Sequence, residues 1–288
     1  MNLTCDWSMM SSFAYCPQRY FREHVEGWTS TRPATSLSFG GALHKGLQAI
    51  CENIELSGAI SYFRLLFAPF DGLDKVRTME KGEEILRAFV EQGRNKDWKT
   101  ELCEVSFNFE AAPGFHYCGK IDRLGKKEGV RAVQDFKTST QPWQFISNPN
   151  HQATGYLTGV KTVLDPKVEE FYFEMIRVQG SSKEGYVTIK GKPGQESRTE
   201  SIFQSMLVTR SQKQIEGFLQ DILGWAEQIQ VCMDSSRWPK NTENCNGKYG
   251  LCQFHPVCLA GEGGEAVLEM MYKKEKWNPI EGRRGGNE

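Results

Sequence analysis

The 288-residue sequence contains no apolar run long enough to form a membrane-spanning helix, which argues against an integral membrane protein of the helical class. Its first ten residues also lack the basic and apolar regions of a secretory signal peptide. We therefore expect a soluble, intracellular (cytoplasmic) protein with no membrane partner. Apolar residues make up 39% of the chain and aromatic residues 11%, which is ample for a packed core.

The sequence has almost no excess of charge of either sign, with a formal net charge of −1. No global field therefore attracts nucleic acid, and any such contact must use a local group of basic residues. The chain also has no internal repeat, no Walker loop and no dinucleotide fingerprint. The usual signatures of P-loop ATPases and nicotinamide-dependent enzymes are thus missing.

Nine cysteines occur without a secretion signal, so a disulfide framework is not expected. Three of them, Cys245, Cys252 and Cys258, form a C-x6-C-x5-C run in a segment rich in Gly and Asn. Three thiolates are one ligand short of a tetrahedral set, which predicts a distant fourth ligand. The run lacks the C-x2-C clip usual in zinc sites, yet zinc stays an open alternative, with His255 as a further ligand.

Two strand patterns, residues 119–124 (GKIDRL) and 133–138 (VQDFKT), flank a turn-rich segment and predict a β-hairpin. Side chains alternate along a strand, so Asp135 and Lys137 share one face. If Asp122 lies beside them, two carboxylates converge and repel each other unless a cation such as Mg²⁺ or Mn²⁺ neutralises them. The alternative is a surface hairpin with ordinary solvated charges.

Helical periodicity elsewhere alternates with further strand patterns. Residues 7–21 predict a helix with a Cys-Pro break at Cys16, and residues 38–53 predict a helix with His44 at the edge of its apolar stripe. The glycines Gly40 and Gly41 before His44 suggest a close backbone approach. Other helices are expected at residues 59–67, 74–92, from 151 onward and at 211–232, strands at 101–110, 167–178 and 182–189 (the last two as a possible hairpin), and a frayed tail after Gly261.

Together these segments resemble the PD-(D/E)XK nuclease superfamily, and in particular its iron–sulfur branch of RecB- and AddB-type nucleases and CRISPR-associated adaptation exonucleases. The motifs in order are a Cys-Pro helix, G-x2-H, G-x-I-D, D-x-K, Q-x3-Y and a C-terminal cysteine group. The resemblance implies an α/β fold, with a central mixed β-sheet flanked by helices in a restriction-endonuclease-like core. It also implies one nuclease domain over residues 1–262 with a helical insertion at about 56–97, followed by a tail over 263–288.

The same resemblance assigns roles around the hairpin. His44, Asp122, Asp135 and the backbone carbonyl of Phe136 correspond to ligands of a Mg²⁺ or Mn²⁺ ion. Lys137 corresponds to the lysine that positions and activates the attacking water. Asp135 stands where many relatives have glutamate, a change that still permits metal binding.

Two more motifs carry over from the family. Gln152 and Tyr156, one helical turn apart, match the residues that line the active site and help to hold the substrate backbone. The resemblance also implies a 4Fe–4S cluster that clasps the C-terminal segment to the first helix. Six residues separate two of its cysteines where the family pattern has two, and the four ligands would be Cys16, Cys245, Cys252 and Cys258.

These features predict a metal-dependent DNA nuclease, an exonuclease that acts on single-stranded or frayed ends in recombination, repair, or phage or defence DNA processing. A helicase or a recombination or defence protein is a candidate partner, because the chain has no helicase region. Alternatives are a catalytically silent DNA-binding or scaffolding protein of the same fold, a zinc-stabilised nucleic-acid-binding module and an iron–sulfur redox or radical enzyme. We expect the 56–97 insertion to roof a narrow track, with base stacking on Tyr156 or Trp143 and phosphate contacts from Lys120, Arg123, Lys126, Lys127 and Arg131.

Overall fold

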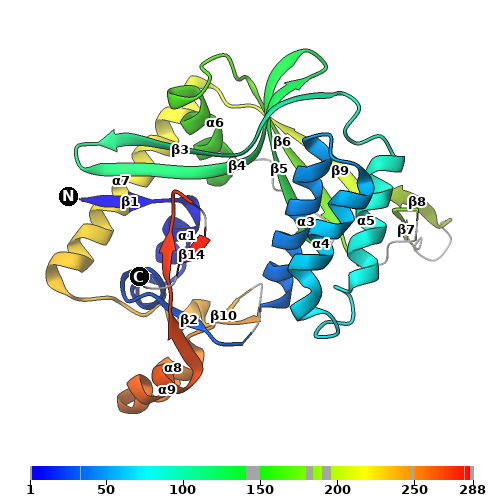
Figure 1. Ribbon diagram of the computed structural model, residues 1–288. Coiled ribbons are helices and arrows are strands. Elements are labelled where there is room, and N and C mark those ends of the chain that lie inside the picture. The colour runs from blue at the N-terminus through cyan, green and yellow to red at the C-terminus, as the bar shows by residue number, and fades with distance from the viewer. Residues whose placement is uncertain are drawn as a thin grey trace.

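A six-stranded mixed sheet forms the centre of the protein (Figure 1), which we describe from a computed structural model. The description covers residues 2–32, 34–140, 150–179, 184–189, 196–247, 250–281 and 283–285. The strand order is β1-β4-β5-β6-β9, with β3 also paired to β4. The pairs β1/β4 and β5/β6 are parallel and the others antiparallel, so the sheet is mixed as the sequence predicts. Its strands are β1 (Leu3–Cys5), β3 (Trp98–Ala112), β4 (Phe115–Lys127), β5 (Val130–Ser139), β6 (Glu170–Arg177) and β9 (Phe203–Val208).

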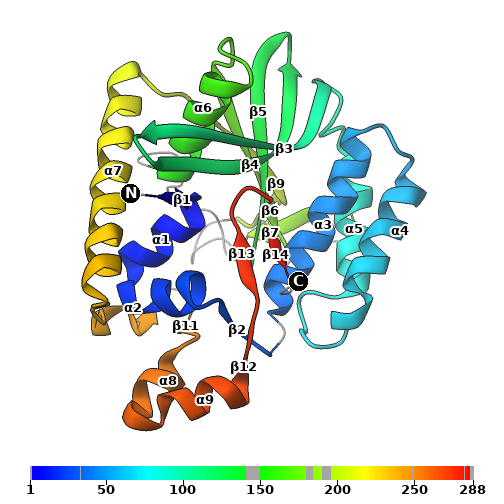
Figure 2. The ribbon, with the colours of Figure 1, turned by 60° about the vertical axis from the view of Figure 1, so that its left-hand side comes forward.

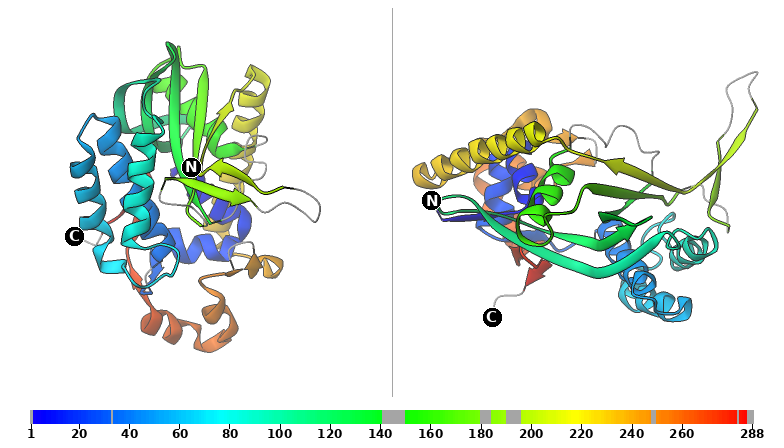
Figure 3. Two further views of the ribbon diagram at one scale, coloured as in Figure 1. Left: turned by 90° about the vertical axis from the view of Figure 1, so that its right-hand side faces the viewer. Right: turned by 90° about the horizontal axis from the view of Figure 1, so that it is seen from above.

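Helices cover both faces of this sheet, and each face has its own apolar core (Figure 3). One core joins α1, α6 and α7 to the sheet, and the other joins α3, α4 and α5 to it. No described helix is both long and apolar enough to span a membrane. The α- and π-helical segments are α1 (Trp7–Tyr15), α2 (Pro17–Tyr20), the π-helical turn η1 (Phe21–Val25), α3 (Thr35–Cys51), α4 (Leu56–Phe67), α5 (Met79–Glu91), α6 (His151–Val163), α7 (Gln212–Ser235), α8 (His255–Leu259) and α9 (Gly264–Met271). Short 3-10 helices are η2 (Ala68–Phe70), η3 (Thr242–Asn244) and η4 (Gly261–Gly263).

The predicted hairpin is confirmed as the antiparallel pair β4/β5, with longer strands than the pattern indicates. The suggested pairing of the strand at 182–189 with the strand at 167–178 is wrong. Strand β7 (Tyr186–Ile189) pairs instead with β8 (Arg198–Ser201), and β6 pairs with β9. The neighbour of β6 is chosen by burial, because Phe203 of β9 joins the core beside α5, a contact that local pattern does not reveal.

The residues after Gly261 are not a frayed tail where the structure describes them. Helix α9 is followed by β12 (Tyr272–Lys274), which pairs with β2 (Trp28–Ser30), and by β13 (Lys276–Asn278), which pairs with β14 (Arg283–Gly285). Leu268 and Tyr272 are buried in a small third core. Burial of these side chains explains why this charge-rich segment is ordered. Figure 2 shows α8 and α9 below the rest of the protein and β13 running up from β12 between α1 and α3.

The first helix and the cysteine-rich segment lie side by side. The Asn244 side-chain amide donates to the Tyr15 carbonyl at 2.7 Å, and the Tyr15 hydroxyl donates to the Asn244 carbonyl. The Asn241 N–H lies 3.4 Å from Cys16 Sγ in hydrogen-bond geometry. Ordinary hydrogen bonds therefore join these distant segments, which include β10 (Asn246–Gly247) and β11 (Gly250–Leu251).

Candidate active site

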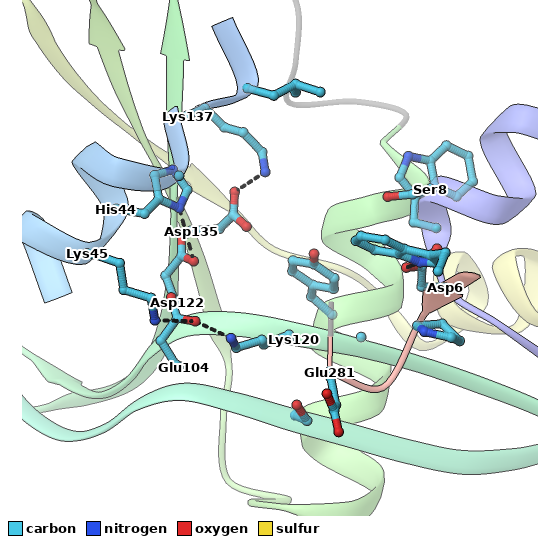
Figure 4. Close-up of a pocket in the computed structure, with 18 residues that line it drawn as sticks. Asp6, Ser8, His44, Lys45, Glu104, Lys120, Asp122, Asp135, Lys137 and Glu281 are labelled. Carbon is cyan, nitrogen blue, oxygen red and sulfur yellow. Dashed lines mark hydrogen bonds and ion pairs between the residues drawn. The ribbon is translucent and has the colours of Figure 1, made fainter. Parts of the chain in front are cut away.

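A cavity of about 900 Å³ opens above β3, β4 and β5, between helix α3 on one side and the start of α1 with the β13 segment on the other (Figure 4). Helix α6 contributes Tyr156 to its lining. The cavity is lined by Asp6, Trp7, Ser8, Leu37, Gly41, His44, Lys45, Glu104, Ser106, Gly119, Lys120, Asp122, Asp135, Lys137, Tyr156, Trp277, Pro279 and Glu281.

Helix α3 brings His44 over the hairpin. Nδ1 of His44 lies 3.4 Å from Oδ1 of Asp122, and Oδ2 of Asp122 accepts a hydrogen bond of 2.6 Å from the Phe136 N–H. A Cβ on Gly40 would lie 3.3 Å from Thr138 Oγ1, so this glycine does lie at a close approach. Gly41 has open space and lines the cavity instead.

Asp135 and Lys137 face the same cavity, as strand alternation predicts. Lys137 Nζ lies 2.5 Å from Asp135 Oδ2, and the Asp135 side chain is almost fully buried. This oxygen nevertheless has no partner in hydrogen-bond geometry. A buried carboxylate oxygen without a hydrogen-bond donor is suited to bind a cation in the cavity.

Burial and neighbouring charges shift the pKa values of these groups in different directions. Burial alone would raise the pKa of Asp122, but His44, Lys137 and the Phe136 N–H together hold it below its ordinary value. Burial by itself would lower the pKa of His44. The nearby Asp122 carboxylate has the larger effect, so the pKa of His44 lies above its ordinary value. Burial, with repulsion from Asp122, raises the pKa of Asp135 to about 6 despite the opposing charge of Lys137. Adding a divalent cation would relieve the repulsion between the carboxylates.

One imidazole and two carboxylates on a single cavity form a donor set that suits Mg²⁺ or Mn²⁺. Within the described part of the chain, no three His, Cys, Asp or Glu side chains already stand in metal-binding geometry. His44, Asp122 and Asp135 are the side chains of this cavity that would hold such an ion. A ligand role for the Phe136 carbonyl stays a prediction.

The residue pair expected on α6 forms a contact of its own. Asn150 caps the helix by accepting a hydrogen bond from the Ala153 N–H, and Gln152 Nε2 then donates to the Tyr156 hydroxyl at 3.1 Å. Tyr156 lines the cavity as predicted, but Gln152 is not among the lining residues. Gly159 lets the helix approach the sheet, because a Cβ there would overlap the Phe107 ring.

A family model described as the PD-(D/E)XK nuclease superfamily matches residues 7–259. The chain belongs to this superfamily. Among curated proteins, no sequence matches it. Membership of this family supports a nuclease activity with DNA as the substrate. Nucleases of this family generally use Mg²⁺ or Mn²⁺.

Two solved structures are similar to this PD-(D/E)XK protein at low sequence identity. A candidate exonuclease from Eubacterium rectale is 14% identical, with 84% of this chain and 85% of that chain covered and a TM-score of 0.54. That likeness shows a shared fold alone. The structure of SSO0001 is also 14% identical, over 66% of this chain and 73% of its own, and its TM-score of 0.29 carries no argument.

Several residues of the PD-(D/E)XK cavity have no predicted role in the sequence. Lys45 follows His44 directly on α3, and Glu104 lies in the strand pattern at 101–110. Across the cavity, Figure 4 places Asp6 and Ser8 opposite Asp122 and Asp135. Adjacency to His44 is a signal for Lys45, but no local pattern places the chain termini beside the hairpin.

The predicted basic track is largely wrong, because only Lys120 lines the cavity. Arg123 is fully buried, with its guanidinium 4.5 Å from the centre of the Trp98 ring. Arg131 pairs with Glu101 and Asp165 instead. The side chains of Lys126 and Lys127 do not line the cavity either.

The expected roof over the cavity is also wrong. No described residue of 56–97 lines it, since Phe63 and Phe89 turn α4 and α5 into the core beside α3. The wall facing the carboxylates instead contains Trp7 and Trp277. Trp143, the other predicted stacking residue, lies outside the described residues.

The four predicted cluster cysteines line a second cavity, of about 260 Å³, together with Arg19 and Lys240. Burial raises the pKa of the Cys252 and Cys258 thiols, and neighbouring cysteines raise both further. All nine cysteines of the chain are free thiols. The four that converge are Cys16, Cys245, Cys252 and Cys258.

Proposed function

We propose that this protein is a Mg²⁺- or Mn²⁺-dependent deoxyribonuclease that hydrolyses phosphodiester bonds at this cavity. The observation that carries the proposal is the convergence of Asp122, Asp135 and Lys137 beside His44 on one wall. Family membership supports the reaction class, and the shared cavity of these side chains supports the choice of residues.

Each side chain has a separate task in this proposal. A bound divalent ion supplies charge neutralisation for the pentacovalent transition state and lowers the pKa of water. His44, Asp122 and Asp135 hold that ion, and Asp122 is itself oriented by the Phe136 N–H. Lys137 reaches over the cavity, where its ammonium orients the attacking water and stabilises developing negative charge.

The decisive experiment compares cleavage of end-labelled linear DNA and closed circular DNA with Mg²⁺, Mn²⁺ or EDTA. Asp122→Asn, Asp135→Asn and Lys137→Ala should each lower the rate by about 100-fold or more while circular dichroism and thermal unfolding stay close to wild type. Asp234→Asn, which removes an exposed carboxylate on α7, is the matched control. Cleavage at the wild-type rate by any of the three variants would rule out this active site.

We further propose an exonuclease that prefers single-stranded or frayed ends. The support is that two tryptophans, Trp7 and Trp277, line the same cavity as Asp122 and Asp135. Aromatic rings stack on unpaired bases with little sequence preference, and paired bases do not offer their faces in this way. Shortening of linear single strands from the end is the expected result. Fast linearisation of closed circular duplex, with linear ends left intact, would contradict it.

The proposal includes a 4Fe–4S cluster at the second cavity. Four cysteines from the two ends of the chain line it, and Arg19 and Lys240 offset the negative charge that four thiolates would bring. Protein purified without oxygen should contain iron and acid-labile sulfide in near-equal amounts. Stoichiometric zinc without sulfide would support a structural zinc site instead.

A further inference from the structure

A second charged group lies in the main cavity beside the catalytic one. Lys45 Nζ lies 3.2 Å from Oε2 of Glu104, and Lys120 Nζ contacts the same oxygen (Figure 4). The three residues come from α3, β3 and β4, so the fold assembles them from three separate elements. One carboxylate oxygen thus bridges two ammonium groups.

Glu104 holds this position through an uncommon backbone conformation. Its φ is 54°, in the left-handed region that non-glycine residues rarely adopt. The neighbouring pairs Cys103↔Arg123 and Val105↔Ile121 place Glu104 across from Asp122. The strained backbone sets the carboxylate between the lysines, next to the proposed metal site.

We propose that Lys45 and Lys120 bind a second phosphate group of the DNA strand, and that Glu104 occupies this phosphate site while no strand is bound. The inference rests on the proposed function, since it takes the ligand to be nucleic acid. Two ammonium groups that share one anionic oxygen are arranged as they would be around a phosphate oxygen.

Two observations favour a phosphate over another metal ion at this position. Two ammonium groups beside Glu104 repel a cation, and they attract an anion. Lys120 and Asp122 lie two residues apart on β4, so their side chains leave the same face about 6.6 Å apart. That separation is on the order of the distance between neighbouring phosphates of an extended strand. The scissile phosphate at Asp122 would therefore place the next one at Lys120.

The test measures the affinity of a fluorescent single-stranded oligothymidylate in EDTA, where no cleavage occurs. Lys45→Ala and Lys120→Ala should each weaken binding about tenfold. Each should also reduce the salt dependence of log K by about 0.7. Glu104→Gln should tighten binding several-fold, because it removes the competing charge and keeps the side chain's size. Lys213→Ala, which removes an exposed lysine on α7, should leave the affinity unchanged.

The opposite sign of the Glu104 effect separates this inference from a structural ion network. The inference would be overturned if Lys45→Ala, Lys120→Ala and Glu104→Gln all weakened binding, or if none of the three changed the affinity. If Glu104→Gln only raises the metal concentration needed for cleavage, Glu104 is a metal ligand and the phosphate site is wrong. Failure of oligothymidylate to bind the wild-type protein would also overturn it.

Oligonucleotides with a 5′-phosphate, a 3′-phosphate or hydroxyl ends distinguish the two sources of the phosphate. If a terminal phosphate tightens binding to wild type but not to the lysine variants, Lys45 and Lys120 bind the phosphate at a strand end. If the three oligonucleotides bind wild type equally well, and both lysine variants weaken binding of all three, the lysines bind an internal phosphodiester. None of these binding measurements requires catalysis. The nuclease proposal is tested separately, by whether Asp135→Asn still cleaves DNA, so each proposal can fail without the other.

Discussion

The indole N–H of Trp277 donates a hydrogen bond of 2.7 Å to Oδ2 of Asp6, a residue 271 positions earlier in the chain. Oδ1 of Asp6 accepts a hydrogen bond of 2.8 Å from the Met9 N–H and so caps α1. One buried carboxylate therefore starts the first helix and anchors the β13 segment. The two ends of the chain together form the cavity wall that faces the proposed catalytic residues.

Trp277→Phe should destabilise the protein and largely keep its binding of single strands. The change removes the indole N–H and leaves the buried Asp6 carboxylate one donor short, at a cost of about 1–3 kcal/mol. The ring that faces the cavity is retained. Trp277→Ala removes both and should also weaken oligonucleotide binding. Urea unfolding and anisotropy measure the two effects, and equal affinities for both variants would exclude stacking on this residue.

Asp6 should make stability depend on pH between about 4 and 6. Burial raises its pKa from 3.8 to about 6, outweighing hydrogen bonds from Met9 and Trp277. The folded protein therefore holds this proton more tightly than the unfolded chain. The stabilisation is complete below pH 4 and is lost as the pH rises through 6, by about 3 kcal/mol.

Measuring the unfolding free energy of wild type and Asp6→Asn from pH 4 to 7 checks this. The advantage of wild type over the variant should shrink as the pH rises and be constant above about 6. Asp6→Asn also alters the hydrogen bond to Trp277. The resulting loss of stability is the same at every pH, so it does not affect how the difference varies with pH. Asp97→Asn, at an exposed position, is the control, and a pH-independent difference for Asp6→Asn would contradict the prediction.

Cys258→Ser should lower stability before it affects the chemistry. The proposed cluster closes a loop that spans almost the whole chain, and losing such a link costs about 2–5 kcal/mol. Protease cleavage after Cys245 should increase, and iron should be lost. Cys232→Ser lies outside the cysteine cavity and should keep its iron. Native thermal stability with lost activity alone would show that the cysteines do something other than join the two ends.

Two glycine-to-alanine changes in helices should have opposite effects. A Cβ on Gly82 of α5 would overlap the Phe63 ring, so Gly82→Ala should cost about 2 kcal/mol through overpacking. No atom lies within 4 Å of a Cβ built on Gly224 of α7. Gly224→Ala should therefore stabilise by up to about 1 kcal/mol, the helix-propensity gain. Thermal unfolding measures both, and a stabilising Gly82→Ala would contradict the close packing of α4 on α5.

Local pattern was sufficient to predict the elements that carry the proposed catalytic residues. The period of two along 133–138 places Asp135 and Lys137 together, and the apolar stripe of 38–53 turns Phe39 and Leu43 inward. The helix at 211–232 is likewise confirmed as α7, which buries Phe218, Ile222, Ala226 and Ile229. Each of these predictions depends only on residues within a few turns or strand positions of one another.

The surroundings of the proposed catalytic residues could not be predicted in this way. Arg123 and Lys120 are both basic residues of one strand, yet the first stacks on Trp98 inside the protein and the second reaches Glu104 in the cavity. The sequence by itself determined the β4/β5 hairpin, the helices α3 and α7, and the shared face of Asp135 and Lys137. Only the tertiary structure decided which basic residues face the cavity and that Trp277 and Asp6 form its far wall. The reason is physical: those contacts join residues far apart in the chain and exist only once packing brings their elements together.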